Sequence, residues 1–228
     1  MLEELVRGDT TYYLLGTAHV SRASVDEVRE TVARLKPDVV CVELDQQRRD
    51  ALVSGRKPGL AVARRMLRER KLLYLIAQLT LAAYQRRIGT RLGVKPGAEM
   101  VAALDSAREL GARVALIDRD LEVTLKRAWS ALSLTQRALL AASIGIALVR
   151  TGPITAEAVE ALKDPKARAQ VIDELARAMP EIKEAVLDER DRYMADRMLE
   201  AGRGANRVVA VVGAAHVPGM SAQIRATA

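Results

Sequence analysis

The sequence contains one short motif twice, near its two ends. The two copies read Leu-Gly-Thr-Ala-His-Val and Val-Gly-Ala-Ala-His-Val, and they hold the only histidines of the chain, His19 and His216. A nearly uncharged run of β-branched, aromatic or leucine residues precedes each copy, at residues 12–15 and 208–212. Such runs are typical of strands buried on both faces of a parallel sheet. The repetition therefore predicts a fold in which two distant segments end at one edge of a sheet.

Each motif places an imidazole just beyond the end of its strand. A glycine there lets the backbone turn sharply or approach a ligand closely. Because open α/β folds bind ligands at the carboxyl edge of the sheet, His19 and His216 are expected to face a single cleft. A lone histidine at a strand end is usually an ordinary hydrogen-bonded residue. Two in the same six-residue context instead indicate a shared metal ion or an acid–base pair.

Two further apolar runs complete the predicted sheet. Residues 39–44 carry a single charge, Glu43, and residues 113–117 lead directly into Asp118. A carboxylate at the end of a buried strand is costly unless it is paired, hydrogen-bonded or bound to a cation. Glu43 and Asp118 are therefore candidate site residues, although Asp118 is also a candidate helix cap.

The intervening segments follow helical patterns. The order of predicted elements is strand, helix, strand, helices, strand, helices, strand and helix. This order predicts an α/β fold, with a mostly parallel sheet of about four core strands covered by helices. We expect one domain over residues 1–228, with a large helical insertion at roughly residues 56–97 and a helix-rich segment at roughly residues 121–205. The sequence contains neither a Gly-x-Gly-x-x-Gly dinucleotide motif nor a Walker loop.

Three polar segments give more specific predictions. The chain is predicted to be helical over residues 121–150, and one long helix is predicted from residue 181 to about residue 200. This second segment contains the charged run at residues 188–194, whose alternating signs are typical of a salt-bridged, exposed helix face. The segment that begins at Asp45 opens a helix or turn, in which Arg48 either points over the sheet edge or is solvated.

Composition limits the partners. The formal charge of +7 favours an acidic partner, an anionic membrane surface or nucleic acid. We exclude nucleic acid because the chain has no recognisable binding module and too few aromatic residues for a stacking platform. The only cysteine, Cys41, lies in an apolar run, so it is expected to be a buried residue and not part of a disulfide or metal site. With no signal-peptide pattern and no apolar stretch of spanning length, the chain is expected to be soluble.

Several motifs, in this order, resemble the TraB/PrgY pheromone-shutdown family. The resemblance extends from one end of the chain to the other and is shared more loosely with the Tiki proteins, which are Wnt-directed membrane proteases, and with a group that includes erythromycin esterase. Besides the two histidine motifs, it rests on Pro-Asp-Val-Val-Cys-Val-Glu-Leu followed by Arg48, Gly-Ala-Glu-Met, Asp-Arg-Asp and Glu-Arg-Asp-x-Tyr-Met, at residues 37–44, 97–100, 118–120 and 189–194.

The resemblance implies a metal-dependent, peptidase-like site. Carried over position by position, the metal ligands are His19, His216 and Glu43, and the arginine of the Glu-Arg motif is Arg190. Arg48 and Glu189 are implied as neighbours. With nitrogen and oxygen ligands and no thiolate, Zn, Mn and Co all suit the site.

The remaining charged residues suit supporting roles. Glu189 or Asp118 would move a proton, and Arg190 or Arg48 would hold a substrate carboxylate or a developing oxyanion. Two alternatives stay open. One is a metal-free hydrolase that uses a histidine as general base, and the other is a non-catalytic regulator that binds a peptide or a membrane partner.

Family members often carry transmembrane helices after the second histidine motif. The chain therefore resembles the soluble domain of a longer, membrane-associated protein. The basic segment at residues 64–71 and the lone cysteine favour the cytoplasmic face. A homodimer is the default oligomer on general grounds alone.

Overall fold

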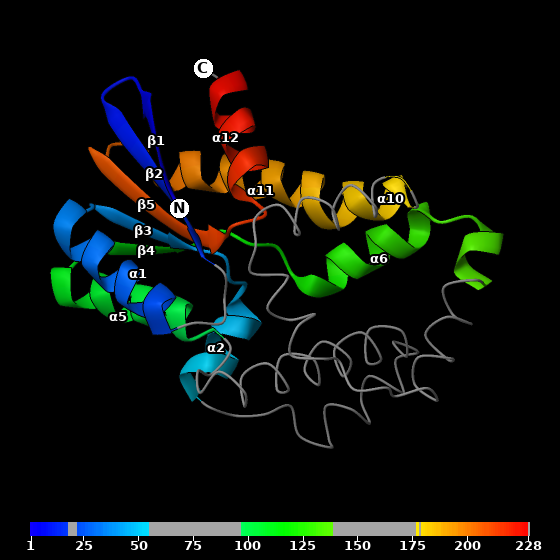
Figure 1. Ribbon diagram of the computed structural model, residues 1–228, viewed down its shortest axis with the longest axis horizontal. Helices are drawn as coiled ribbons and strands as arrows, with labels where there is room; N and C mark the ends of the chain where they lie inside the picture. Colours follow the sequence, from blue (N-terminus) through cyan, green and yellow to red (C-terminus); the bar gives the residue numbers. More distant parts are fainter. Residues whose placement is uncertain (18–21, 55–96, 139–176, 178, 228) are drawn as a thin grey trace. The chain divides into compact units, whose positions relative to one another are not determined.

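The computed structural model describes residues 1–17, 22–54, 97–138, 177 and 179–227 (Figure 1). These residues belong to two compact units, which are considered separately. The first unit comprises Met1–Asp120 with Asp191–Ala228, and the second comprises Leu121–Arg190. His19 and nearly all of the predicted insertion at residues 56–97 lie outside the described residues.

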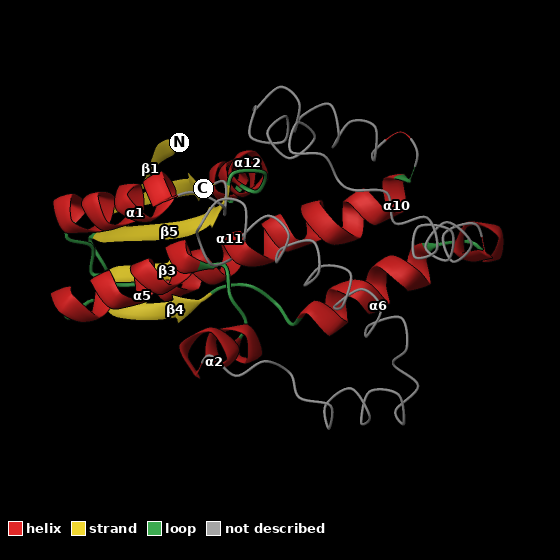
Figure 2. Cartoon of the chain, turned by 60° about the horizontal axis from the view of Figure 1, so that its bottom comes forward, coloured by secondary structure: helices red, strands yellow, loops and turns green. Residues whose placement is uncertain are grey.

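The first unit is built on a five-stranded sheet. Its strands are β1 (Leu2–Arg7), β2 (Thr10–Thr17), β3 (Val39–Val42), β4 (Arg113–Leu116) and β5 (Arg207–Gly213), in the spatial order β1-β2-β5-β3-β4. Strands β2, β5, β3 and β4 are parallel, and β5, β3 and β4 run side by side in Figure 2. The predicted α/β class and the four parallel core strands are thus confirmed. The fifth strand, β1, pairs antiparallel with β2 at the edge of the sheet.

Helices cover both faces of this sheet (Figure 1). Helices α1 (Arg22–Leu35) and α5 (Ala98–Leu110) pack on one face, and α11 (Glu189–Ala201) and α12 (Val217–Ala226) pack on the other. Successive strand residues point to opposite faces, so β5 divides its side chains between two cores. Those at positions 208, 210 and 212 join the α11 and α12 core, whereas those at 209 and 211 join the α1 and α5 core.

Local sequence signals explain several boundaries. Helix α5 ends at Gly111, whose backbone has φ 66° and donates to carbonyls of the last turn. Glycine suits this left-handed position because it has no Cβ. Helix α2 (Gln46–Ser54) follows β3 and begins just after Asp45, whose Oδ1 accepts from the Arg48 backbone N–H at 2.8 Å, as an N-cap does. Cys41 is fully buried as predicted, and burial raises the pKa of its thiol to about 12.

The segment predicted to be helical, residues 121–150, is helical in its described part but is broken once. Helix α6 (Leu121–Ala131) ends at Ala131, and a new helical segment starts after Ser133. Ser133 and Gln136 form a capping box: Gln136 N donates to Ser133 Oγ at 3.3 Å, and Ser133 N donates to Gln136 Oε1 at 2.8 Å. This reciprocal pair satisfies backbone donors at the start of the new segment and explains the break.

The helix predicted over residues 181–200 is also not uniform. It consists of α10 (Pro180–Lys183), a π-helical turn η1 (Glu184–Asp188) and then α11. Single π turns inside helices occur frequently at functional sites. This turn directly precedes the Glu-Arg motif in the sequence.

Asp38 ties the amino ends of β3 and β5 together. Its Oδ2 accepts from the backbone N–H of Asn206 at 2.7 Å and of Arg207 at 2.9 Å. These two backbone hydrogen bonds hold the pKa of the Asp38 carboxyl below its ordinary value of 3.8. The ionised carboxylate therefore favours the folded state.

Replacing Asp38 with alanine is expected to lower the free energy of unfolding by about 1–2 kcal/mol at neutral pH, as for other carboxylates that bind exposed backbone donors. Because the folded-state pKa is lowered, this stabilisation is present above about pH 4 and is lost as the pH falls through the folded-state value. Denaturant unfolding of both proteins from pH 7 to pH 3 measures the effect. A difference that stays constant over this range would contradict the explanation.

Candidate functional site

Glu43 and His216 meet at the carboxyl edge of the sheet. Glu43 directly follows β3, and its backbone N–H still donates to Val211 O of β5 at 3.1 Å. His216 follows the end of β5 and precedes α12. Parallel pairing of β3 with β5 brings the two strand ends together. Both side chains are buried.

The imidazole of His216 lies between two carboxylates. Nδ1 is 2.5 Å from Asp191 Oδ1, and Nε2 is 3.4 Å from Glu43 Oε1. The other Glu43 oxygen, Oε2, accepts from the backbone N–H of Gly213 at 2.6 Å. The glycine of the second histidine motif thus fixes the glutamate, and the histidine of the same motif faces it.

Sequence analysis missed Asp191 and assigned its segment to an exposed helix face. That assignment is wrong for this residue, because Asp191 is only 4% exposed. It shares the buried face of α11 with Met194, Ala195 and Met198, at helical spacings of three, four and seven. Arg192 and Tyr193, on the other face, are exposed. The apolar periodicity that begins at Asp191 was the available signal.

A second group of charges follows β3 and β4. The Arg48 guanidinium pairs through Nε with Asp45 Oδ2 at 2.7 Å and through Nη2 with Asp118 Oδ2. The second Asp118 oxygen accepts from the backbone N–H of Arg119 at 2.8 Å. Although burial lowers the pKa of Arg48, the charges and hydrogen bonds of Asp118 and Asp45 raise it above its ordinary value.

Arg48 is therefore paired at the sheet edge, with 34% of its side chain exposed. It links helix α2 to the segment after β4, because Arg48 belongs to α2 and Asp118 follows β4. The sequence did not predict this pairing, which fixes the Asp118 carboxylate beside Arg48. The substrate-binding roles predicted for Arg48 and Asp118 stay predictions.

Glu189 and Arg190 belong to the second unit. Glu189 Oε2 pairs with Arg127 Nη1 of α6 at 3.0 Å, and Arg190 Nη1 donates to Val186 O at 3.3 Å. Both residues directly precede Asp191 in the sequence. Their predicted catalytic and substrate-binding roles stay predictions.

The metal set predicted from the sequence is only partly described. His216 and Glu43 face each other, whereas His19 lies outside the described residues. The last residue of β2, Thr17, pairs with Gly213 of β5, so the strands that lead to the two histidine motifs are neighbours. Within the described ranges alone, no three His, Cys, Asp or Glu side chains form a metal-binding group. The His19 assignment therefore stays a prediction.

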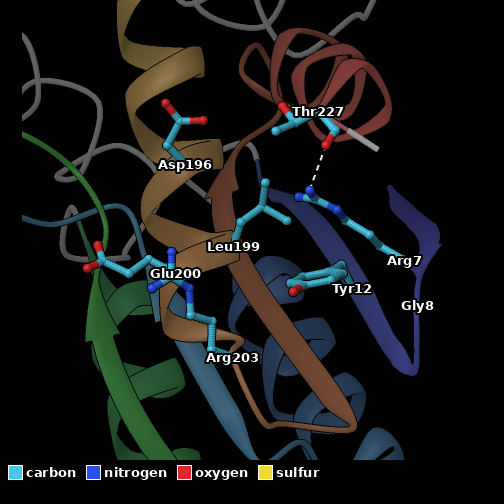
Figure 3. Close-up of a pocket in the computed structure, with 8 residues that line it drawn as sticks. All are labelled: Arg7, Gly8, Tyr12, Asp196, Leu199, Glu200, Arg203 and Thr227. Carbon is cyan, nitrogen blue, oxygen red and sulfur yellow. Dashed lines mark hydrogen bonds between the residues drawn. The ribbon is translucent and has the colours of Figure 1, made fainter.

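A cavity of about 590 Å³ lies elsewhere on the first unit (Figure 3). It is lined by the β1–β2 turn at Gly8, by Tyr12, by the end of α11 and by Thr227, whose carbonyl accepts from Arg7 Nη2 at 2.6 Å. Gly8 and Arg203 precede β2 and β5, so the cavity lies at the amino ends of these strands. It is therefore distinct from the carboxyl-edge site.

Several known proteins are similar to this chain in sequence. The chain is 34% identical over 213 residues to an uncharacterized protein of Methanocaldococcus jannaschii, with 91% of this chain and 52% of that protein covered. It is 33% identical to a TraB domain-containing protein of Bos taurus, with 95% of this chain and 63% of that protein covered. The corresponding human protein is 32% identical, with 91% and 61% covered.

The chain thus spans between half and two thirds of the length of these relatives. Among the helices that the structure describes, none has both the length and the apolar character needed to cross a bilayer. The sequence pattern of the TraB/PrgY/gumN family matches residues 1–226, nearly the entire chain. Together with the relatives, this match shows that the chain belongs to the TraB/PrgY/gumN family.

Proposed function

We propose that the protein is a metal-dependent hydrolase that acts on peptides, with its site at the carboxyl edge of the sheet. The observation that carries the proposal is the approach of Glu43 Oε1 to His216 Nε2, at 3.4 Å. Both groups are buried and each is held by a second contact, Glu43 by the Gly213 N–H and His216 by Asp191. The pair is thus fixed before any ligand binds.

Electrostatics favour a cation between these two groups. A carboxylate at Nδ1 favours the imidazole form that carries its proton on Nδ1, which leaves a lone pair on Nε2. That lone pair then faces a carboxylate oxygen, and two acceptors repel each other at this distance. A shared proton or a metal ion removes the repulsion, and burial increases the gain.

The two donor atoms suit a metal ion. Ligands about 2.1 Å from a tetrahedral ion are about 3.4 Å apart, which matches the separation of Nε2 and Oε1. His216, Glu43 and, from its sequence motif, His19 would hold the ion, and this set of nitrogen and oxygen donors accepts Zn, Mn or Co. Such an ion supplies Lewis acidity that polarises a carbonyl and makes water a better nucleophile near neutral pH.

The other residues predicted from the sequence would orient the substrate and move protons. Asp118, held by Arg48 and the Arg119 N–H, would accept or return a proton at a carboxylate oxygen. Glu189 is the second candidate for this step. Arg190 would bind a substrate carboxylate or a developing oxyanion. The peptide substrate, and the association of the full-length protein with the cytoplasmic face of a membrane, rest on the family resemblance.

A peptide-library digest tests the proposal. The purified chain, dialysed against Zn, Mn or Co, should release products detectable by mass spectrometry, and a chelator should stop their release reversibly. Products that persist in chelator would favour a histidine general base. Peptide binding without products under all metal conditions would contradict the hydrolase proposal and favour a regulator.

A further inference from the structure

We infer that Asp191 is a positioning residue that determines which nitrogen of His216 carries the proton, so that Nε2 faces Glu43 unprotonated, and that Gly219 leaves the space this carboxylate needs. The chemical purpose of the device rests on the proposed function. The contacts themselves do not depend on that function. An unprotonated Nε2 would serve either a metal ion or a general-base reaction.

The contact between Asp191 and His216 joins two rigid segments. Asp191 lies in the first turn of α11, and the next residues on the same face, Met194, Ala195 and Met198, are fully buried. His216 is fixed by its own backbone, since its N–H donates to Gly213 O at 2.9 Å and its carbonyl accepts from Met220 N at 3.0 Å. The 2.5 Å contact therefore connects two elements that packing holds in place.

The carboxylate sets the tautomer of the imidazole. Both carboxylates beside the ring accept hydrogen bonds, but Asp191 Oδ1 is 2.5 Å from Nδ1 whereas Glu43 Oε1 is 3.4 Å from Nε2. The closer acceptor favours the neutral imidazole that carries its proton on Nδ1. In free histidine the other tautomer, with the proton on Nε2, predominates. Asp191 thus reverses the intrinsic preference and directs the basic nitrogen, Nε2, toward Glu43.

Gly219 makes the contact sterically feasible. A Cβ atom built on Gly219 would overlap the Asp191 carboxylate, with Oδ2 as its nearest neighbour and the Asp191 Cγ only 2.7 Å away. Gly219 lies in the first turn of α12, and helices disfavour glycine relative to alanine. The sequence therefore has a residue that helices disfavour at the point where the Asp191 carboxylate packs against α12.

Nitrogen NMR of the full chain tests the inference without any reference to activity. The chain has only two histidines, so selective ¹⁵N labelling gives two imidazoles, and a His19→Gln variant assigns them. In the metal-free parent, at a pH where the imidazole is neutral, His216 should show a protonated Nδ1 and an unprotonated Nε2. Asp191→Asn should move the proton partly or wholly to Nε2, because the amide NH₂ can donate to Nδ1.

Gly219→Ala should have the same effect by displacing the carboxylate while every ionisable group is kept. Asp196→Asn is the matched control, since Asp196 is exposed on the same helix, and it should leave the tautomer unchanged. Where the parent binds metal, Asp191→Asn and Gly219→Ala should each weaken binding by about 10–100-fold, and Asp196→Asn should not.

The outcomes distinguish the positioning role of Asp191 from the proposal of a metal site. If the parent binds no metal but its tautomer changes in Asp191→Asn and Gly219→Ala, the positioning role stands and the metal proposal fails. If backbone spectra show that one variant does not fold, the other still decides the question, because the two substitutions perturb different helices. A parent with its proton on Nε2, or a parent-like tautomer in a folded variant of either kind, would overturn the inference.

Discussion

Replacing Glu43 with glutamine is expected to lower metal affinity and peptide hydrolysis by more than about 100-fold, which is the upper range for residues that only support a metal ligand. Glutamine preserves the size of the side chain and can still accept the Gly213 N–H. It removes the negative charge that faces His216 Nε2. The loss should therefore reflect the chemistry of the site and not its packing.

Glu30→Gln is the matched control. Glu30 is exposed on α1, in the same unit of the structure, so this variant should keep the metal affinity and hydrolysis of the parent. Metal titration and product formation should be measured for all three proteins at one pH. A Glu43→Gln protein that binds metal and cleaves peptide like the parent would exclude Glu43 from the metal set.

Leu14→Ala is expected to lower the free energy of unfolding by about 2–5 kcal/mol. Leu14 is fully buried in β2 and points into the core formed with α11 and α12. Alanine removes three carbon atoms and leaves a cavity that rigid strands on either side fill poorly. Chemical denaturation followed by circular dichroism gives the difference directly.

Leu110→Ala provides the comparison for Leu14. Leu110 lies at the end of α5 and is 42% exposed, so the same truncation there should change stability by less than about 0.5 kcal/mol. Equal effects at the two positions would contradict the assignment of Leu14 to the core. A larger effect at Leu110 would contradict the packing of α5 as well.

Strand periodicity explains how much of the fold was predictable. The runs that became β2, β3, β4 and β5 are apolar because parallel strands are buried on both faces. Strand β1 was missed because its sequence, Leu-Glu-Glu-Leu-Val-Arg, carries three charges, which an edge strand tolerates because one side of it faces solvent. The capping box at Ser133 was visible in the sequence as a serine followed three residues later by Gln136. It lies inside a long helical pattern, so the break in the helix was not predicted.

The meeting of Glu43 with His216 followed from topology alone. Parallel strands end at one edge, so a charge after β3 and a histidine after β5 were expected to lie close together. Asp191 was not predictable in this way, since it lies on a helix and its contact depends on how α11 packs on the sheet. Its charged neighbours made the segment resemble a solvated face, and only tertiary packing distinguishes one carboxylate from the others.

The pairing of Arg48 was also not predictable from the sequence. The position of Arg48 after β3 indicated the sheet edge, but Arg48 and Asp118, which pair there, are 70 residues apart in the sequence. Spacing along the chain does not specify such a pair. The parallel pairing of β3 with β4 brings the segments that follow these strands together.

Metal content, measured by elemental analysis, tests most directly the claim that the two histidine motifs and Glu43 form one metal site. The parent, His19→Ala and His216→Ala proteins would each be dialysed against Zn, Mn and Co and then against metal-free buffer. We predict close to one ion per chain in the parent and a loss of that ion in both variants. A parent that retains no metal under any of these conditions, or variants that retain as much metal as the parent, would contradict the account.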